Sequence, residues 1–286
     1  MSSLLSRIRY RFLLVAGLMP YFMGAAAAYR DLGGIDPSIF LIGLAGIAGA
    51  LVGVEGYNEF FEGRSGADLI FMPENSQPPS WTVIAGTFGF AVMVSTGLYL
   101  SLTVGPLILF LMIYGLLAAV FYVGPPLKWA YRGVGEFVIS LAYGPFMTIG
   151  AYYIQAASLT EAPIIASLVP AFLTFAVVLS NEVPQFIGDR LVGKMNLVVK
   201  FGQERAAKMH ATAIIAGYCS LLLAVWINAI PLTSLIALLT IPIAVWTLKI
   251  SLRSYDKPTE FIKSIRGTVI IYTLVLIIVS ISYLIN

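Results

Sequence analysis

Long apolar runs, separated by shorter polar segments, occupy most of the chain. A transmembrane α-helix needs about 20 predominantly apolar residues. Nine runs are close to that length: residues 12–29, 38–58, 82–102, 104–123, 136–155, 163–182, 211–230, 232–250 and 266–285. They are continuous rather than alternating, which argues against a β-barrel. The pattern predicts an all-α membrane protein, with nine transmembrane helices in one bundle and a single domain over residues 1–286.

The polar segments between the runs differ in length. Adjacent runs separated only by Thr103 or Pro231 must form antiparallel hairpins, whereas longer polar connections are predicted at 59–81, 124–135, 183–210 and 251–265. Residues 1–29 are also similar to a secretory signal peptide, because three arginines precede an apolar run that ends in alanines. We favour a membrane-spanning helix, because the run is longer than the apolar core of a typical signal peptide.

Composition supports the membrane assignment. Of the 286 residues, 59% are hydrophobic and 11% are charged, whereas about a quarter of the residues are charged in an ordinary soluble protein. This excludes a soluble domain, a disordered chain and a disulfide scaffold, and it makes membrane lipid the expected surroundings. The net charge of +3 gives no indication of a nucleic-acid partner, and one cysteine cannot form an internal disulfide.

The distribution of Lys and Arg predicts the orientation of the chain. With the N-terminus in the cytoplasm, sixteen of the 17 Lys and Arg residues fall on the cytoplasmic side and only Arg30 falls on the other. Loops on the cytoplasmic side are enriched in these residues. We therefore expect a cytoplasmic N-terminus, a C-terminus on the opposite side, and a functional site near the cytoplasmic face, where the long polar connections lie.

Four polar residues share one helical face at the end of the second run. Glu55, Asn58, Glu59 and Glu62 are spaced i, i+3, i+4 and i+7. Carboxylates in or beside a membrane span are costly and mark a functional site by default. Oxygen ligands of this kind suit Mg²⁺, which binds one or two carboxylates together with substrate phosphates.

A second polar stripe ends the sixth run. Asn181, Gln185 and Asp189 are spaced i, i+4 and i+8, and the Asn181-Glu182 pair repeats the Asn58-Glu59 pair of the second run. The repetition suggests two related four-helix halves plus one further helix, with their polar patches facing each other. Basic residues accompany both stripes, at Arg64, Lys128, Arg190, Lys194 and Lys200. Metal ions together with Lys and Arg are how proteins hold a diphosphate.

At these residues the chain resembles the UbiA superfamily of intramembrane prenyltransferases. The family's first motif, Asn-Asp-x-x-Asp, corresponds to Asn58-Glu59-x-x-Glu62. The following residues, 63–68, are similar to the quinone-making branch, which includes the dihydroxynaphthoate prenyltransferases of menaquinone synthesis. The second motif corresponds to Asn181, Gln185 and Asp189, and Asp-Arg-x-x-Gly-Lys-x-x-Leu follows over 189–197. The sequence Tyr-x-x-Pro-Pro-Leu-Lys over 122–128 and the pair Gly135-Glu136 also match.

The resemblance implies helices around a central cavity and transfer of a prenyl group from an isoprenyl diphosphate to a lipophilic acceptor. The acceptor it implies is aromatic, a quinone precursor such as 1,4-dihydroxy-2-naphthoate. Mg²⁺ is the implied cofactor. Its implied ligands are Asn58, Glu59, Glu62, Asp68, Asn181, Gln185 and Asp189. The implied diphosphate-binding residues are Arg64, Lys128, Lys194 and Asn181. The implied catalytic residues are Asn58, Glu62, Asp189, Lys128 and Tyr122. Aromatic residues expected to line the cavity are Tyr57, Phe60, Phe61, Tyr114, Tyr122, Tyr143, Tyr152 and Tyr153.

The chain departs from the family pattern at three positions. Glu59 and Glu62 replace aspartates, which lengthens each ligand arm by one methylene, and Gln185 replaces a metal-binding aspartate and so removes a charge. Two other functions are compatible with intramembrane carboxylates: a secondary transporter, and a non-catalytic relative that only binds lipid. A transporter would need no Mg²⁺ and would release no pyrophosphate, so these two observations distinguish it from a prenyltransferase.

Overall fold

A computed structural model describes the backbone of residues 2–65 and 79–286, and the side chains of 17–63 and 79–286. Within these ranges the chain is helical and has no strand. The first half contains α1 (Ser2–Leu32), α2 (Pro37–Ser65), α3 (Trp81–Thr103), α4 (Leu107–Val123), η1 (Trp129–Tyr131), α5 (Gly135–Leu141), η2 (Ala142–Phe146) and α6 (Met147–Ala156). The second half contains α7 (Glu161–Ala166), α8 (Leu168–Glu182), η3 (Val183–Gln185), α9 (Phe186–Leu191), α10 (Leu197–Phe201), α11 (Gln203–Trp226), η4 (Leu232–Thr240), α12 (Ile241–Arg253) and α13 (Pro258–Leu284).

Several helices are long and apolar enough to cross a membrane. Among the described residues seven segments meet both criteria: Pro37–Gly63, Trp81–Thr103, Gly135–Ala156, Glu161–Leu191, Gln203–Trp226, Leu232–Arg253 and Pro258–Leu284. α4 is apolar but shorter, at 17 residues. The chain is therefore an all-α, multi-pass membrane protein, and the exact number of nine spans and their division into two related halves remain predictions.

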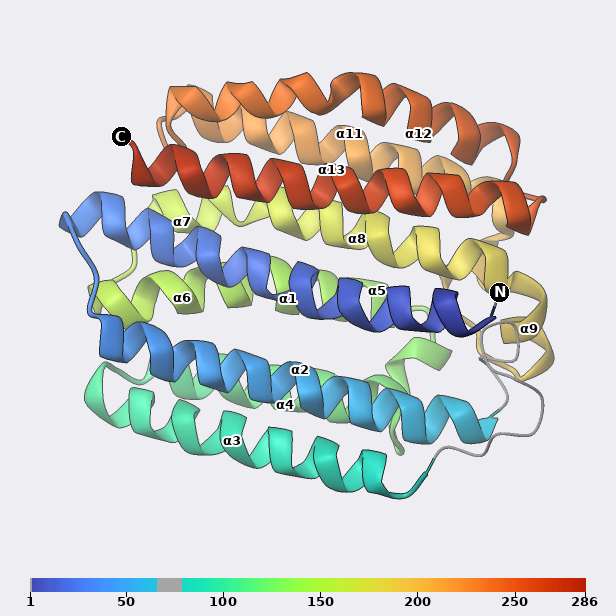
Figure 1. The fold of residues 1–286 in the computed structure, drawn as a ribbon, viewed down its shortest axis with the longest axis horizontal. Helices are drawn as coiled ribbons and strands as arrows, with labels where there is room; N and C mark the ends of the chain where they lie inside the picture. The colour runs from blue at the N-terminus through green and yellow to red at the C-terminus, as the bar shows by residue number, and fades with distance from the viewer. Residues whose placement is uncertain (1, 66–78) are drawn as a thin grey trace.

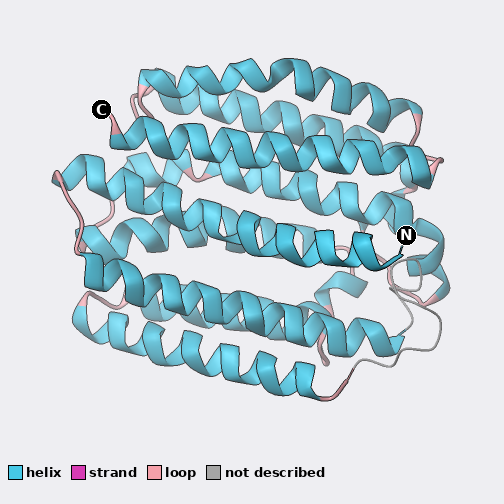
Figure 2. Ribbon diagram, in the orientation of Figure 1, coloured by secondary structure: helices cyan, strands magenta, loops and turns pink. Residues whose placement is uncertain are grey.

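The long helices lie side by side in one bundle (Figures 1 and 2). α1 contacts α6 and α13, α2 contacts α3, α8 contacts α11, and α12 contacts α13. α1 begins at the end of the bundle where α9 lies, and α13 ends at the other (Figure 1). The C-terminal ends of α2, α4 and α8 all reach the end that holds α9, so the segments that carry the two polar stripes gather there.

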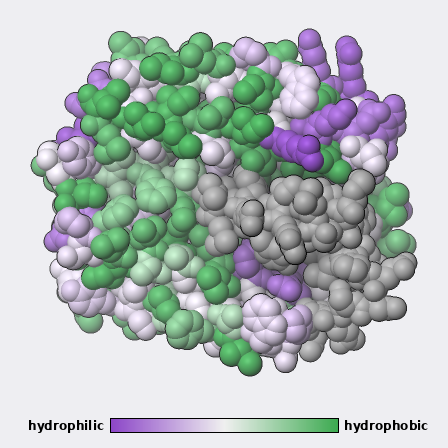
Figure 3. Space-filling model, in the orientation of Figure 1, coloured by the Kyte–Doolittle hydropathy of each residue, from purple (hydrophilic) through white to green (hydrophobic). Residues whose placement is uncertain are grey.

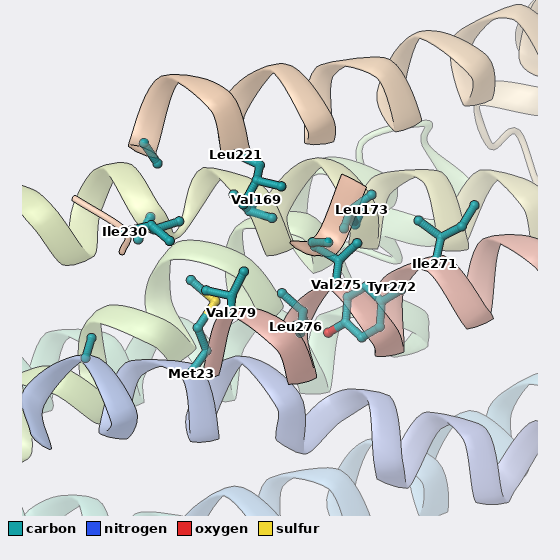
Figure 4. Packing of buried hydrophobic residues seen from close by; sticks show 14 of the residues in the cluster. Met23, Val169, Leu173, Leu221, Ile230, Ile271, Tyr272, Val275, Leu276 and Val279 are labelled. Carbon is teal, nitrogen blue, oxygen red and sulfur yellow. The ribbon is translucent and has the colours of Figure 1, made fainter. Parts of the chain in front are cut away.

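The main hydrophobic core joins α1, α8, α11 and α13. Its fully buried side chains include Met23 of α1, Leu173 of α8, Leu221 of α11, and Ile271 and Leu276 of α13. Figure 4 shows these side chains pointing into the space between the four helices. This core holds together helices from the two halves of the sequence, and it fixes α8 behind the candidate site.

Glycines allow α2 and α3 to approach each other closely. A Cβ atom at Gly49 would lie 2.6 Å from the Gly89 carbonyl oxygen, and one at Gly89 would lie 2.5 Å from the Gly49 carbonyl oxygen. Only residues without a Cβ fit at both positions, as is common where transmembrane helices pack through small residues. The close contact fixes the rotation of α2, and hence the direction in which its polar stripe faces.

The fifth predicted run is a bent helix. α5 and α6 are joined by the π-helical turn η2, which contains Pro145. Proline removes a backbone donor, and π-turns accommodate such interruptions, often at functional sites. Gly144 of this turn lies against the backbone of Ala171 in α8. The turn places Tyr143 and Phe146 on the wall of the cavity described below.

Three of the predicted polar connections proved wrong in extent, because charged helical turns continue beyond the apolar windows. α2 runs to Ser65, past the predicted end at residue 58. The segment 183–210 is not one loop but contains η3, α9, α10 and the first two turns of α11. α13 begins at Pro258 rather than at residue 266. Helices that protrude into the interfacial region carry polar residues that a hydropathy window excludes.

The surface reflects the membrane assignment. Apolar side chains cover much of the face in Figure 3, and hydrophilic side chains gather where α12 ends and α13 begins. This end contains the exposed residues Arg253, Lys257, Lys263 and Arg266. Such a division between an apolar belt and a charged end is expected of a protein whose middle lies in lipid.

Candidate active site

An elongated cavity of about 250 Å³ lies inside the bundle. Most of its wall is apolar and comes from α1, α2, α3, α4, the η2–α6 segment and α8. Its polar lining is concentrated toward the C-terminal ends of α2, α4 and α8, where Glu55, Asn58, Tyr122 and Asn181 lie. An apolar cavity with a few polar groups at one end is the usual form of a site for an amphipathic small molecule.

The polar stripe of α2 turns toward the interior, as its spacing predicts. Glu55 and Asn58 line the cavity, and Glu62, one turn beyond Asn58, is only 3% exposed. The Asn58 Oδ1 atom is buried and accepts no hydrogen bond from any described residue. Buried polar atoms without a partner are rare, so this oxygen is a candidate ligand atom. Glu59 is partly exposed and does not line the cavity.

Lys194 connects the two polar stripes. Its ammonium nitrogen lies 2.8 Å from Glu62 Oε1 and 3.8 Å from Asp189 Oδ1. The three side chains are almost completely buried, with exposures of 7% for Lys194, 4% for Glu62 and 0% for Asp189. Burial acts to lower the pKa of Lys194, but the Glu62 and Asp189 carboxylates raise it by more, and the pKa is held well above its usual value. Lys194 is therefore a permanent cation between two carboxylates.

Asn196 fixes the position of Asp189. Its side-chain nitrogen donates to Asp189 Oδ2 at 2.7 Å, while its side-chain oxygen accepts from the Val199 N–H at 2.9 Å. The second bond caps the start of α10. One fully buried amide thus connects the acidic residue to the fold of the next helix. Sequence analysis gave Asn196 no role; a cap residue directly before an apolar run is the signal that could have identified it.

Glu136 and Glu182 form a second acidic pair beneath the first. Glu136 is fully buried, and its Oε1 atom accepts from the Leu197 N–H at 2.6 Å. Glu182 is also buried, at 6% exposed, and its carboxyl group lies close enough to that of Glu136 for the two to interact. Glu136 therefore anchors the start of α10 to α5 across 61 residues of sequence, an arrangement that no local pattern indicates.

The second stripe is not one regular helical face. Pro184 lies in the short 3₁₀ turn η3, which separates α8 from α9, because proline cannot donate the helical hydrogen bond. Asn181 lines the cavity. Gln185 is buried, and its side-chain nitrogen donates to the Asn181 carbonyl oxygen at 3.1 Å. Asp189 faces Lys194. The expectation of a single face over 181–189 is therefore wrong in its geometry, although all three residues lie at the same end of the bundle.

The remaining predicted residues occupy different places. Tyr122 lines the cavity. Lys128 is exposed and adopts a left-handed conformation with φ of 47°. Its ammonium nitrogen lies 5.5 Å from the centre of the Tyr131 ring, and the ammonium nitrogen of Lys194 lies 6.0 Å from the centre of the same ring. Tyr131 was not predicted. The side chains of Arg64 and Asp68 fall outside the described residues.

Of the aromatic residues expected in the cavity, only some line it. Tyr114, Tyr122 and Tyr143 do, and Phe146 and Tyr272 join them. The expectation is wrong for five others: Tyr57, Phe60, Phe61, Tyr152 and Tyr153 are absent from the cavity wall. Tyr57 packs on Phe61 and Phe90 instead, because the glycines of α2 draw α3 against that side of the helix.

The donor set fits a magnesium ion. Glu62 and Asp189 converge on one cation, and Asn58 offers a buried oxygen without a hydrogen-bond donor. Among the described residues, no three His, Cys, Asp or Glu side chains form a metal site by themselves. Mg²⁺ characteristically takes one or two carboxylates and completes its shell with substrate phosphates and water, so two carboxylates and an amide suffice.

Comparison with known proteins decides the family. The model of the UbiA prenyltransferase family matches residues 17–265, which include both polar stripes and every cavity-lining residue except Tyr272. The chain belongs to the UbiA prenyltransferase family. The resemblance found in the sequence motifs is therefore confirmed, and membership implies a transferase.

Two relatives of known name are about a fifth to a quarter identical to this chain over the aligned residues. The UbiA prenyltransferase domain-containing protein 1 of Ailuropoda melanoleuca is 27% identical over 237 residues, which cover 76% of this chain and 69% of the relative. The 2-carboxy-1,4-naphthoquinone phytyltransferase of a Synechocystis strain is 21% identical over 253 residues, which cover 85% of this chain and 80% of the relative.

Solved structures show the same fold. A digeranylgeranylglyceryl phosphate synthase superimposes with a TM-score of 0.69 at 14% identity, covering 98% of this chain and 96% of that one. A UbiA homologue from Aeropyrum pernix gives a TM-score of 0.69 at 12% identity, covering 92% of this chain and 97% of that one. The fold of this UbiA protein is thus established by structure as well as by sequence.

Proposed function

We propose that this UbiA protein transfers a prenyl group from an isoprenyl diphosphate to a lipophilic aromatic acceptor of the quinone-precursor type. The observation that carries the proposal is the meeting of Glu62 and Asp189, 127 positions apart in the sequence, at Lys194. This meeting point lies one helical turn beyond Asn58, which lines the polar end of a long apolar cavity. A substrate with a charged head and an apolar tail matches this combination of buried charges and apolar cavity. The naphthoquinone phytyltransferase relative supports an aromatic acceptor.

Some residues at the polar end would hold the metal, and others would bind the diphosphate or keep the binding residues in place. Asn58, Glu62 and Asp189 would hold Mg²⁺, which when bound neutralises diphosphate charge and so makes it a better leaving group. Lys194 adds a fixed positive charge in a buried, low-dielectric place, where it acts more strongly than in water. Asn196 and Glu136 keep the segment from Asp189 to Leu197 in place. We infer supporting roles for Asn181, Lys128 and Arg64 at the diphosphate, and for Glu59, Asp68 and Gln185 at the metal.

The cavity protects the reacting carbon. When the allylic C–O bond breaks, its electron pair stays on the diphosphate and the prenyl carbon becomes a cation. The acceptor carbon then supplies the electron pair of the new C–C bond, and the ring loses a proton. Tyr122 and Tyr143 lie on the cavity wall, where their ring faces can stabilise a cation. The surrounding apolar wall keeps water from capturing it.

The first test is a reaction in detergent with an isoprenyl diphosphate and 1,4-dihydroxy-2-naphthoate, with Mg²⁺ or with EDTA. We expect Mg²⁺-dependent release of pyrophosphate and formation of prenylated naphthoate, both lost in Glu62→Ala and Asp189→Ala. Pyrophosphate without a naphthoate product would reject this acceptor and keep the ionisation site. Release of no pyrophosphate with any aromatic acceptor would reject the proposal. The exposed Lys208 of α11, which pairs with Glu204 and belongs to neither stripe, provides the control variant Lys208→Ala.

A further inference from the structure

The cavity has a definite length between its polar end and its far end. On α4 the lining residues run from Tyr122 at the polar end to Ile108 at the other. On α2 they run from Asn58 to Gly43. With a rise of 1.5 Å per residue, the two helices give about 21 Å and about 22 Å. Two independent walls therefore agree on the depth of the cavity.

The far end is closed by packed side chains. Tyr21, Leu100, Ile108, Ala151 and Ile154 form one buried hydrophobic cluster, and all five line the cavity. We call this cluster the floor.

Two observations show that the floor is firmly held. The Tyr21 hydroxyl donates to the Phe40 carbonyl oxygen at 2.6 Å, which fixes the ring. Tyr21 and Ile154 meet over Gly43: a Cβ atom on that glycine would lie 2.5 Å from the Tyr21 hydroxyl and 2.6 Å from Ile154 Cδ1. An apolar chain that enters from the polar end therefore meets fixed side chains at this depth.

We propose that the floor limits the prenyl chain to four five-carbon units. The inference rests on the proposed function, because it places the diphosphate at the polar end. Each extended five-carbon unit adds four carbon–carbon bonds, and at ~1.5 Å per bond, shortened by the bond angles, this is about 5 Å. Four units match the ~21 Å between Tyr122 and Ile108. A fifth unit projects about 5 Å into the floor, and three units leave its last turn unfilled.

The test measures binding, so that it does not depend on turnover. Non-hydrolysable thiolodiphosphates with prenyl chains of 10, 15, 20 and 25 carbons are titrated into the detergent-solubilised protein in a calorimeter, with Mg²⁺ present. We expect affinity to rise with each unit up to 20 carbons and to fall at least about tenfold at 25 carbons, as is usual for an apolar group that a closed pocket cannot accept.

Two variants on α3 form a matched pair. Leu100 is in the floor and 4% exposed, whereas Leu102, two residues later, is 87% exposed on the outside of the bundle. We expect Leu100→Ala to restore 25-carbon binding about tenfold, because it shortens a floor side chain, while Leu102→Ala keeps the wild-type profile. Ile154→Ala provides a second opening of the floor if Leu100→Ala does not fold.

A third variant shortens the cavity. Gly115 lines it halfway along α4, and a Cβ atom there would contact only the flexible end of Met93, at 3.0 Å. Gly115→Leu should move the affinity maximum from 20 carbons toward 10. Equal affinity for 20 and 25 carbons in the wild-type protein, or a profile that neither floor variant changes, would overturn the proposal and indicate that the tail leaves between helices. A protein that shows the expected length profile but never releases pyrophosphate would refute the proposed function and retain the floor.

Discussion

Removing the charge of the buried Lys194 should destabilise the protein more than removing the charge of an exposed lysine. In Lys194→Met the side chain keeps a similar length but leaves Glu62 and Asp189 facing each other without a cation. At an effective dielectric constant of ~20, the contacts of 2.8 and 3.8 Å are worth about 6 and about 4 kcal/mol before desolvation is subtracted. Removing one partner of a buried pair usually costs ~3–5 kcal/mol. We expect a loss in this range.

The assay is thermal unfolding in detergent, in EDTA and at neutral pH. A loss of ~3–5 kcal/mol corresponds to a decrease of the midpoint on the order of 10 °C for a chain of this size. The double variant Lys194→Met, Glu62→Gln should regain part of the loss, because it removes one of the two opposing carboxylates. The control is Lys208→Met: Lys208 pairs with Glu204 at 2.7 Å, but both side chains are exposed, at 65% and 59%. It should unfold like the wild type.

Mg²⁺ and pH give two further readouts of the same perturbation. If Glu62 and Asp189 bind Mg²⁺, the ion should raise the midpoint of Lys194→Met by more than that of the wild type, because it binds the folded state. The pKa of Lys194 is raised in the folded protein. Its contribution is therefore fully present below the pKa of ~10.4 for an unfolded lysine and is lost only above it, so raising the pH from 7 to 9 should not remove it. A Lys194→Met midpoint within about 1 °C of the wild type would refute the ion-pair reasoning, because buried pairs do not break at so small a cost.

Three other substitutions test separate parts of the structure. Asn196→Ala should raise the Mg²⁺ concentration needed for half-maximal turnover and lower the stability by ~2–3 kcal/mol, because the variant loses the hydrogen bond to the Asp189 carboxylate and the cap of α10. An unchanged Mg²⁺ dependence would contradict the positioning role of Asn196. His210→Ala should lower the stability by ~2–4 kcal/mol, because both ring nitrogens form hydrogen bonds with buried hydroxyl groups, those of Ser251 and Thr268. Turnover per folded molecule should stay the same. A loss of turnover without a loss of stability would assign His210 to the site. Gln185→Asp should lower the Mg²⁺ concentration required for turnover and lower the midpoint of thermal unfolding in EDTA. The variant adds a buried carboxylate and loses the hydrogen bond from Gln185 to the backbone of the preceding turn. A Mg²⁺ requirement equal to that of the wild type would exclude position 185 from the metal site.

The first polar stripe could be predicted because it lies on one regular helix. α2 continues without interruption from Pro37 to Ser65, so the spacing of Glu55, Asn58 and Glu62 translates directly into a shared face. The apolar runs likewise predicted the class of fold, because lipid allows few alternatives to helices. The spacing of residues along the sequence was sufficient to predict which side chains share a face wherever the helix is regular.

The second half of the site could not be predicted in the same way. Its geometry depends on contacts between distant parts of the chain: Lys194 reaches Glu62 across 132 residues, and the start of α10 is held by Glu136. Pro184 then breaks the helical register between Asn181 and Asp189. The sequence shows that these residues are polar and near a membrane face, but only the packing of α5 against α8 decides which of them meet.

The two tasks of the site, holding a charged head and enclosing an apolar tail, are combined on α2. Its inner face is apolar from Gly43 through Ala50 and becomes polar at Glu55 and Asn58. Because both parts lie on one continuous helix, the position proposed for the diphosphate also sets the depth proposed for the end of the tail. The proposed metal-binding stripe and the floor are therefore connected features: the Tyr21 hydroxyl of α1 donates to the Phe40 carbonyl oxygen of α2, so the helix that carries the stripe also positions a side chain of the floor, and the proposed length preference should change when either one moves relative to the other.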